Sequence, residues 1–142
     1  MSQKILVPLD ATSASGPVLA AAVAEARWRG ADLVLVRAIS LPTTLPAEAY
    51  TMAPDKVADL LERTARAEFA KLREAVPADV EVSVRVEFGA AWQVIGEVAK
   101  SEGVALIVMG AHDRRLLDGI LGTTATRVIN HTDRSVLIVR AT

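Results

Sequence analysis

The stretch that decides the fold is Val104–Thr126, VALIVMGAHDRRLLDGILGTTAT. It begins with a continuous apolar run, which is typical of a strand that is covered on both faces. Gly110 ends this run, a charged loop follows, and Gly122, Thr123 and Thr124 open a segment with helical spacing. The stretch therefore predicts a buried parallel strand, a polar loop and the first turn of a helix.

A loop of this kind, at the carboxyl end of a parallel strand and before a helix, is where α/β proteins hold phosphate. Free backbone N–H groups and the positive end of the helix dipole point to that place. The hydroxyls of Thr123 and Thr124 offer further hydrogen bonds to phosphate oxygens. The alternative is that one of these threonines only caps the helix and that the loop lies in solvent. The stretch alone does not decide between the two.

The rest of the chain alternates between strand and helix patterns. Strands are expected at residues 4–9, 33–39, 80–86, 104–109 and 135–140, and helices at 17–29, 54–76 and 89–102, with a last helix marked by Ala125, Val128 and Ile129. Leu60 is assigned to the apolar stripe of the second helix, Gly30 and Gly103 are expected helix stops, and residues 40–53 form a long loop. We expect one doubly wound α/β domain over residues 1–142, with five parallel strands in the order 3-2-1-4-5 and helices on both faces.

Composition excludes several function classes. The chain has 142 residues, a formal net charge of −1 and no cysteine, so nothing indicates a nucleic-acid partner, a membrane, a disulfide or thiolate catalysis. His112 and His131 are the only histidines, too few to hold a metal ion without help. There is no P-loop and no nucleophile elbow, so no catalytic residue is assigned. Trp92 is expected to be a packing residue, and a cytoplasmic location follows by default.

A binding crevice is expected where the strand order reverses, outside the carboxyl ends of the first and fourth strands. Asp10 follows the first strand and Gly110 ends the fourth, so the two are expected to face each other. An acceptor at Asp10 and donors at Gly122, Thr123 and Thr124 suit a nucleotide, with the base or ribose on one side and the phosphates on the other.

Over essentially its whole length the chain resembles the universal stress protein family. Four segments carry the resemblance: Ile5–Asp10 (ILVPLD), Asp32–Val36 (DLVLV), Leu106–Gly110 (LIVMG) and Ser135–Arg140 (SVLIVR). ATP-binding members have Gly, two residues, Gly, nine residues, and then Gly-Ser or Gly-Thr. Gly110 and the pair Gly122-Thr123 match the two ends of this motif. Asp113 stands in place of the second glycine, and the eight residues that separate it from Gly122 are one short.

The resemblance implies an adenine-nucleotide site, with ATP as the first choice and Mg²⁺ carried by the nucleotide. The positions that it assigns to binding are Pro8, Leu9, Asp10, Ala38, Met109, Gly110, His112, Gly122, Thr123 and Thr124. The departures around Asp113 leave two alternatives open: a site for AMP or cyclic AMP, and a dimeric interaction module that binds no nucleotide. The family further implies a stress-response regulatory homodimer, in which slow ATP hydrolysis stays open.

The last strand supports a homodimer independently of the resemblance. Val136, Leu137, Ile138 and Val139 make it apolar on both faces, yet the predicted strand order places it at an edge of the sheet. An unpaired apolar edge strand invites pairing with another chain. Pairing with a second copy across a two-fold axis would remove that edge.

Overall fold

The computed structural model describes residues 2–10, 15–40, 53–111 and 121–140. Its elements in chain order are β1 (Lys4–Pro8), α1 (Ser15–Arg29), β2 (Asp32–Ile39), α2 (Pro54–Glu74), β3 (Val82–Phe88), α3 (Ala91–Glu102), β4 (Leu106–Gly110), α4 (Thr123–His131) and β5 (Ser135–Val139). The five strands form one parallel sheet in the order β3-β2-β1-β4-β5. The predicted single α/β domain and its strand order are therefore confirmed.

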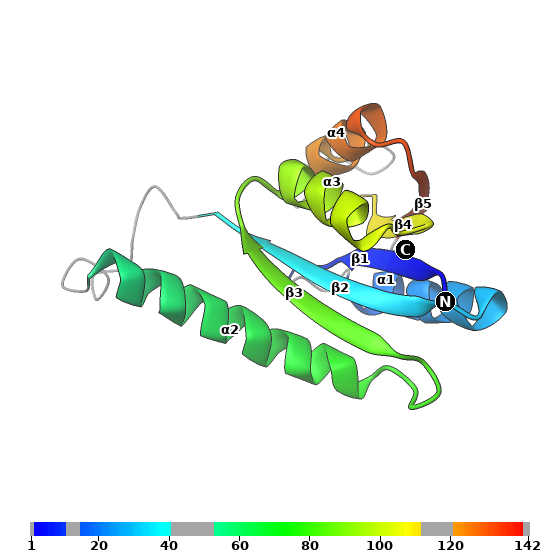
Figure 1. Cartoon of the computed structure of the whole chain (residues 1–142), viewed down its shortest axis with the longest axis horizontal. Coiled ribbons are helices and arrows are strands. Elements are labelled where there is room, and N and C mark those ends of the chain that lie inside the picture. The colour runs from blue at the N-terminus through cyan, green and yellow to red at the C-terminus, as the bar shows by residue number, and fades with distance from the viewer. Residues whose placement is uncertain (1, 11–14, 41–52, 112–120, 141–142) are drawn as a thin grey trace.

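Two apolar cores lie on opposite faces of the sheet. One is shared with α1 and α2, and the other with α3 and α4, which Figure 1 shows on the upper side of the sheet. Side chains alternate along a strand, so Ile5 and Val7 join the first core while Leu6 joins the second. All three are fully buried. Because β1 and β4 are covered on both faces, their sequences are continuous apolar runs.

Two glycines end helices as predicted. Gly30 follows α1 with φ +63°, and Gly103 follows α3 with φ +62°, in the left-handed region that glycine adopts without steric cost. At the end of α3 the N–H groups of Gly103 and Val104 donate to the carbonyls of Lys100 and Ala99, both at 3.1 Å. This arrangement satisfies carbonyl groups that the helix itself leaves unpaired.

The structure corrects three details of the predicted pattern. Leu60 is 46% exposed and Ile129 is 42% exposed, so neither belongs to a buried stripe. Leu60 lies about 130° around α2 from the middle of the residues that face the sheet. Ile129 flanks the buried pair of α4, Ala125 and Val128. The third strand begins at Val82, because the N–H of the buried Val80 turns back to the carbonyl of Pro77.

No helix within the described residues combines the length and the apolar character that are needed to cross a membrane. Most of the expected loop at residues 40–53 and the predicted charged loop after β4 lie outside the described residues.

Candidate functional site

The strand order reverses at β1, which has β2 on one side and β4 on the other. Pro8 ends β1, Ala38 lies near the end of β2, and Met109 lies near the end of β4. Ala38 and Met109 belong to the core beneath α3 and α4, and Pro8 shares that face because it follows Leu6 by two residues. Three residues predicted for the site thus lie on adjacent strands, on the same face of the sheet and at the carboxyl ends of the strands.

The two residues after β1, Leu9 and Asp10, are placed differently with respect to the proposed site. Leu9 is buried in the core on the opposite face, and its N–H extends the pairing with β2 by donating to the carbonyl of Val36 at 3.0 Å. Only the backbone of Leu9 therefore remains at this edge of the sheet. Asp10 is exposed, and its carbonyl accepts a hydrogen bond from the hydroxyl of the buried Ser15, at the start of α1. This bond holds the chain after β1 against the first turn of α1.

The N-terminus of α4 lies at the end of β4. The N–H of Gly122 donates to the carbonyl of Ala111 at 2.7 Å, and the N–H of Ala111 donates to the carbonyl of Val139 at 3.0 Å. The residue after β4 and the first residue before α4 are thus joined directly through their backbones. Sequence reasoning gave Ala111 no role, although its place directly after the strand-ending glycine was the available signal.

Gly122 itself is the N-cap residue of α4, with φ −63° and ψ 159°. Of the two alternatives left open by the sequence, the one in which a threonine caps this helix is therefore wrong. Because glycine has no side chain, it cannot cap the first-turn N–H groups that follow it. Thr123 is exposed and Thr124 is half-buried in that same turn. Uncapped N–H groups and two hydroxyls at a helix N-terminus form a donor set suited to an anion.

Gly110 is half-buried between this edge of the sheet and α1. A Cβ atom placed on Gly110 would lie 3.4 Å from Cγ2 of Val18, in ordinary contact, so α1 packs over the end of β4 with little space to spare. His112 and Asp113, which the sequence placed in the phosphate loop, lie outside the described residues.

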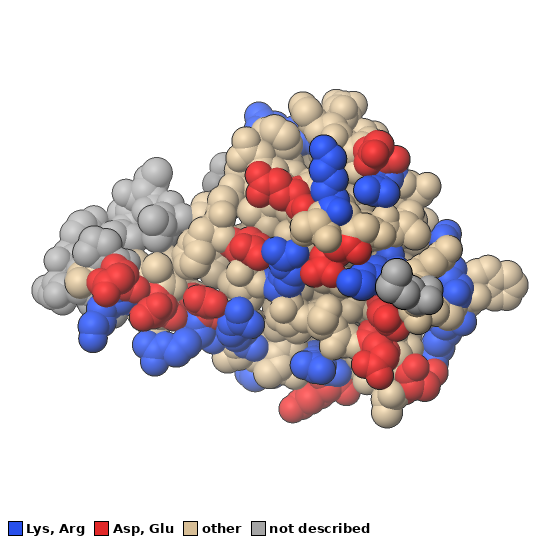
Figure 2. Space-filling model, viewed as in Figure 1, with Lys and Arg blue, Asp and Glu red and all other residues tan. Residues whose placement is uncertain are grey.

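The charges of the described residues do not favour a macromolecular polyanion. Figure 2 shows Lys and Arg side chains interspersed with Asp and Glu side chains across the face in view. Among the described residues, no three side chains of His, Asp or Glu gather closely enough to hold a metal ion. The arrangement at this end of the sheet instead suits a small molecule with an anionic group at α4 and an apolar group over the half-buried Pro8 and Ala38, next to the buried Met109.

Comparisons with known proteins agree with this fold. A family model described as the universal stress protein family matches residues 1–140. The hypothetical protein MJ0577 is similar in structure, with a TM-score of 0.84 and 22% identity, over 100% of this chain and 98% of that one. A universal stress protein in complex with cAMP has a TM-score of 0.62 and 25% identity, over 96% of this chain and 95% of that one. The universal stress protein from Archaeoglobus fulgidus in complex with dAMP has a TM-score of 0.64 and 20% identity, over 96% and 97%.

Proposed function

Because this chain belongs to the universal stress protein family, we propose that it binds an adenine nucleotide, ATP first, at the carboxyl edge of β1, β2 and β4. The observation that carries the proposal is the 2.7 Å hydrogen bond from Gly122 to Ala111, which joins the N-terminus of α4 to the end of β4. Two related proteins were solved with cAMP and with dAMP, so adenine nucleotides are ligands among its structural neighbours.

In the proposed complex the adenine base rests over the half-buried Pro8 and Ala38, and Met109, whose side chain is buried in the core, borders the site next to Gly110. The ribose lies near Asp10 and Gly110, and the backbone of Leu9 supports that side of the site. The phosphates take hydrogen bonds from Thr123, Thr124 and the first-turn N–H groups of α4. His112 is assigned to the phosphate side from its place in the sequence, and Mg²⁺ accompanies the nucleotide through the phosphate oxygens.

The biological role that we propose is that of a cytoplasmic, stress-response regulatory homodimer. The exposed edge strand β5 supports the dimer, since Val136–Val139 are all half-buried and β5 pairs only with β4 in the described sheet. No residue is assigned to catalysis.

The test is a thermal melt of the purified protein with Mg-ATP, AMP or cyclic AMP. A ligand at 100 times its dissociation constant stabilises a folded protein by about 2.7 kcal/mol. For a domain of this size we expect the melting temperature to rise by about 5–10 °C with ATP. Gly122→Val should abolish the rise, because its side chain would stand in front of the first-turn N–H groups. The φ of −63° accepts valine, so the variant should fold.

Gly96→Ala in α3 is the matched control, since an added Cβ there meets nothing within 4 Å. It should keep the full nucleotide response. A folded Gly122→Val protein that binds ATP as tightly as the wild type would overturn the site assignment.

In the same melt, Asp113→Gly should enlarge the ATP response if the aspartate opposes the phosphates. A rise with AMP or cyclic AMP alone would assign the site to a ligand with fewer phosphates, and no rise with any of them would favour the interaction module that binds no nucleotide.

A further inference from the structure

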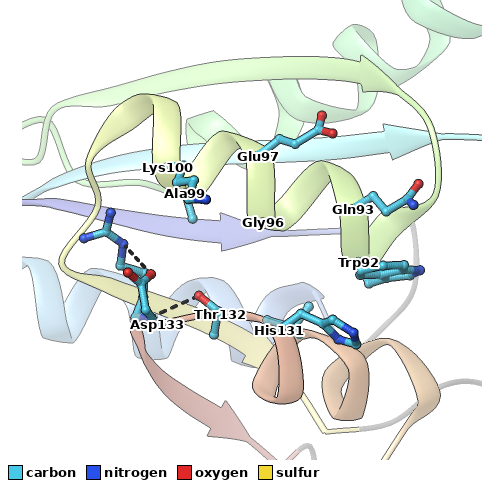
Figure 3. A pocket seen from close by; sticks show the side chains of 11 residues that line it. Trp92, Gln93, Gly96, Glu97, Ala99, Lys100, His131, Thr132 and Asp133 are labelled. Atoms are coloured by element: carbon cyan, nitrogen blue, oxygen red, sulfur yellow. Dashed lines mark hydrogen bonds and ion pairs between the residues drawn. The ribbon is translucent and has the colours of Figure 1, made fainter.

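A second concave site lies between α3 and α4, away from the sheet edge described above. It is a cavity of about 320 Å³, which is at the small end of the range for small-molecule pockets. Gly96, Ala99 and Val128 give it an apolar floor, and Ala99 and Val128 are buried in the core beneath the two helices. Figure 3 shows the cavity running along α3, from Trp92 at one end to Lys100 at the other.

One end of this cavity carries a net positive charge. Lys100 of α3 and Arg134, just before β5, both line it, together with Asp133. The ammonium group of Lys100 makes no hydrogen bond or ion pair with any described residue. The carboxylate of Asp133 lies 3.3 Å from Nε of Arg134, but that buried Nε makes no hydrogen bond, and Asp133 is 77% exposed. Asp133 balances one of the two cations, so one positive charge remains in excess at this end. The carboxylate of Glu97 points away from α4 (Figure 3).

The other end is an aromatic wall. The rings of Trp92 and His131 lie 4.7 Å apart between centroids, and the Arg127 guanidinium lies 5.8 Å from the centre of the Trp92 ring. His131 is held in turn, because its Nδ1 lies 2.7 Å from the carbonyl of Arg127 and must donate to it. These contacts fix the indole in place before any ligand arrives.

From the cations Lys100 and Arg134 at one end, the apolar floor, and the aromatic wall at the other end, we propose that this cavity binds a small organic monocarboxylate with an aromatic tail. The carboxylate accepts hydrogen bonds from Lys100 and Arg134, and the tail lies on the floor against Trp92. Trp92 and Lys100 are eight residues apart, which is about 12 Å along the helix, so the ligand needs a linker between its ring and its acid group.

This site is separate from the proposed nucleotide site. The nucleotide site uses the N-terminal turn of α4, at Thr123 and Thr124, whereas the cavity uses the C-terminal end of the same helix, at Val128 and His131. The proposed carboxylate binding therefore does not depend on nucleotide binding, and it is tested in nucleotide-free protein.

The experiment uses Trp92 as its own reporter. Trp28 is 88% exposed, so Trp28→Phe should leave the fold intact and Trp92 as the only tryptophan. This protein is titrated with 4-phenylbutyrate, and binding is measured by tryptophan fluorescence and, independently, by equilibrium dialysis. We expect saturable binding with a dissociation constant of about 1 mM or tighter. The neutral 4-phenylbutyramide tests whether binding needs the negative charge, and butyrate tests whether it needs the aromatic ring. Each should bind at least about tenfold more weakly than 4-phenylbutyrate.

Lys100→Met in the same background should weaken phenylbutyrate binding about tenfold, since Lys100 is exposed and its loss does not disturb the core. The matched control is Lys71→Met, which removes an exposed lysine from α2 and should change nothing. The proposal is overturned if neither method detects saturable phenylbutyrate binding up to about 10 mM. Equal binding of phenylbutyramide, or an unchanged affinity in Lys100→Met, would also overturn it.

Discussion

Glu102 shows how one residue joins three elements of the fold. It is the last residue of α3, where a carboxylate is opposed by the negative end of the helix dipole. Two cations offset this conflict: Nζ of Lys4 in β1 lies 2.8 Å from Oε2, and a guanidinium nitrogen of Arg85 in β3 lies 3.3 Å from Oε1. The hydrogen bond from Lys4 is the main cause that lowers the pKa of Glu102, and Arg85 acts in the same direction against burial.

The lowered pKa gives a stability prediction with a definite sign. Above its ordinary value of 4.5, Glu102 is charged in both states, and its interactions contribute in full to the folded protein. As the pH falls through the lowered pKa, the unfolded chain binds the proton more readily and that contribution is lost. We expect Glu102→Gln to reduce the free energy of unfolding by about 1 kcal/mol at pH 7. The difference from wild type should shrink as the pH falls below 4.5 and vanish once the carboxyl is protonated in both the folded and the unfolded state.

Urea unfolding at a series of pH values measures this difference. The control is Glu62→Gln, which removes only the i,i+4 ion pair of Glu62 with Arg66 on α2 and should cost less than about 0.5 kcal/mol. A Glu102→Gln deficit that stays the same from pH 7 to pH 3 would contradict the assigned role of the carboxylate.

At the scale of elements, α3 has one glycine within it and another directly after it, with opposite requirements. Gly96 lies inside the helix, where an added Cβ meets nothing within 4 Å, so Gly96→Ala should raise the free energy of unfolding by about 0.5–1 kcal/mol. Gly103 ends the helix with φ +62°, so Gly103→Ala should lower it by about 1 kcal/mol. Urea unfolding of the two variants, with far-UV circular dichroism to check the fold, measures both changes. Two changes of the same sign would contradict this assignment.

Elements such as β1, β4 and the end of α3 could be predicted because each of their signals is local. The apolar run Val104–Met109 by itself predicts a buried strand, and Gly103 by itself predicts the end of a helix. The geometry of the proposed nucleotide site was predictable only as far as strand order brings Pro8, Ala38 and Met109 to the same end of the sheet. The cavity between α3 and α4 was not predictable, because it depends on how Trp92 and His131, from separate helices, pack together. Leu60 was assigned to the apolar stripe because it is apolar and precedes Leu61, although it lies about 130° around the helix from the residues that face the sheet.

At the scale of the whole molecule, the two edges of the sheet differ. On the β3 edge, the guanidinium of Arg73 in α2 donates to the carbonyl of Val82 at 3.2 Å. The N–H of Leu33 in β2 binds the carbonyl of Glu81, so by alternation the carbonyl of Val82 points away from the sheet. A side chain thus occupies part of this edge and discourages pairing with another chain. No side chain of the described residues makes a hydrogen bond of this kind to the backbone of Val136–Val139 in β5.

This asymmetry predicts that dimerisation uses β5 and depends on its outward N–H groups. The carbonyl of Val139 accepts from Ala111 next to β4, so by alternation the N–H of Ile138 points away from β4. Ile138→Pro removes that donor without breaking the β4 pairing, a change that edge strands tolerate. We expect wild type to sediment as a dimer and Ile138→Pro as a folded monomer. Ile138→Val, which trims the side chain but keeps the N–H, should remain dimeric. A monomeric wild type, or a dimeric Ile138→Pro, would exclude β5 pairing as the basis of assembly.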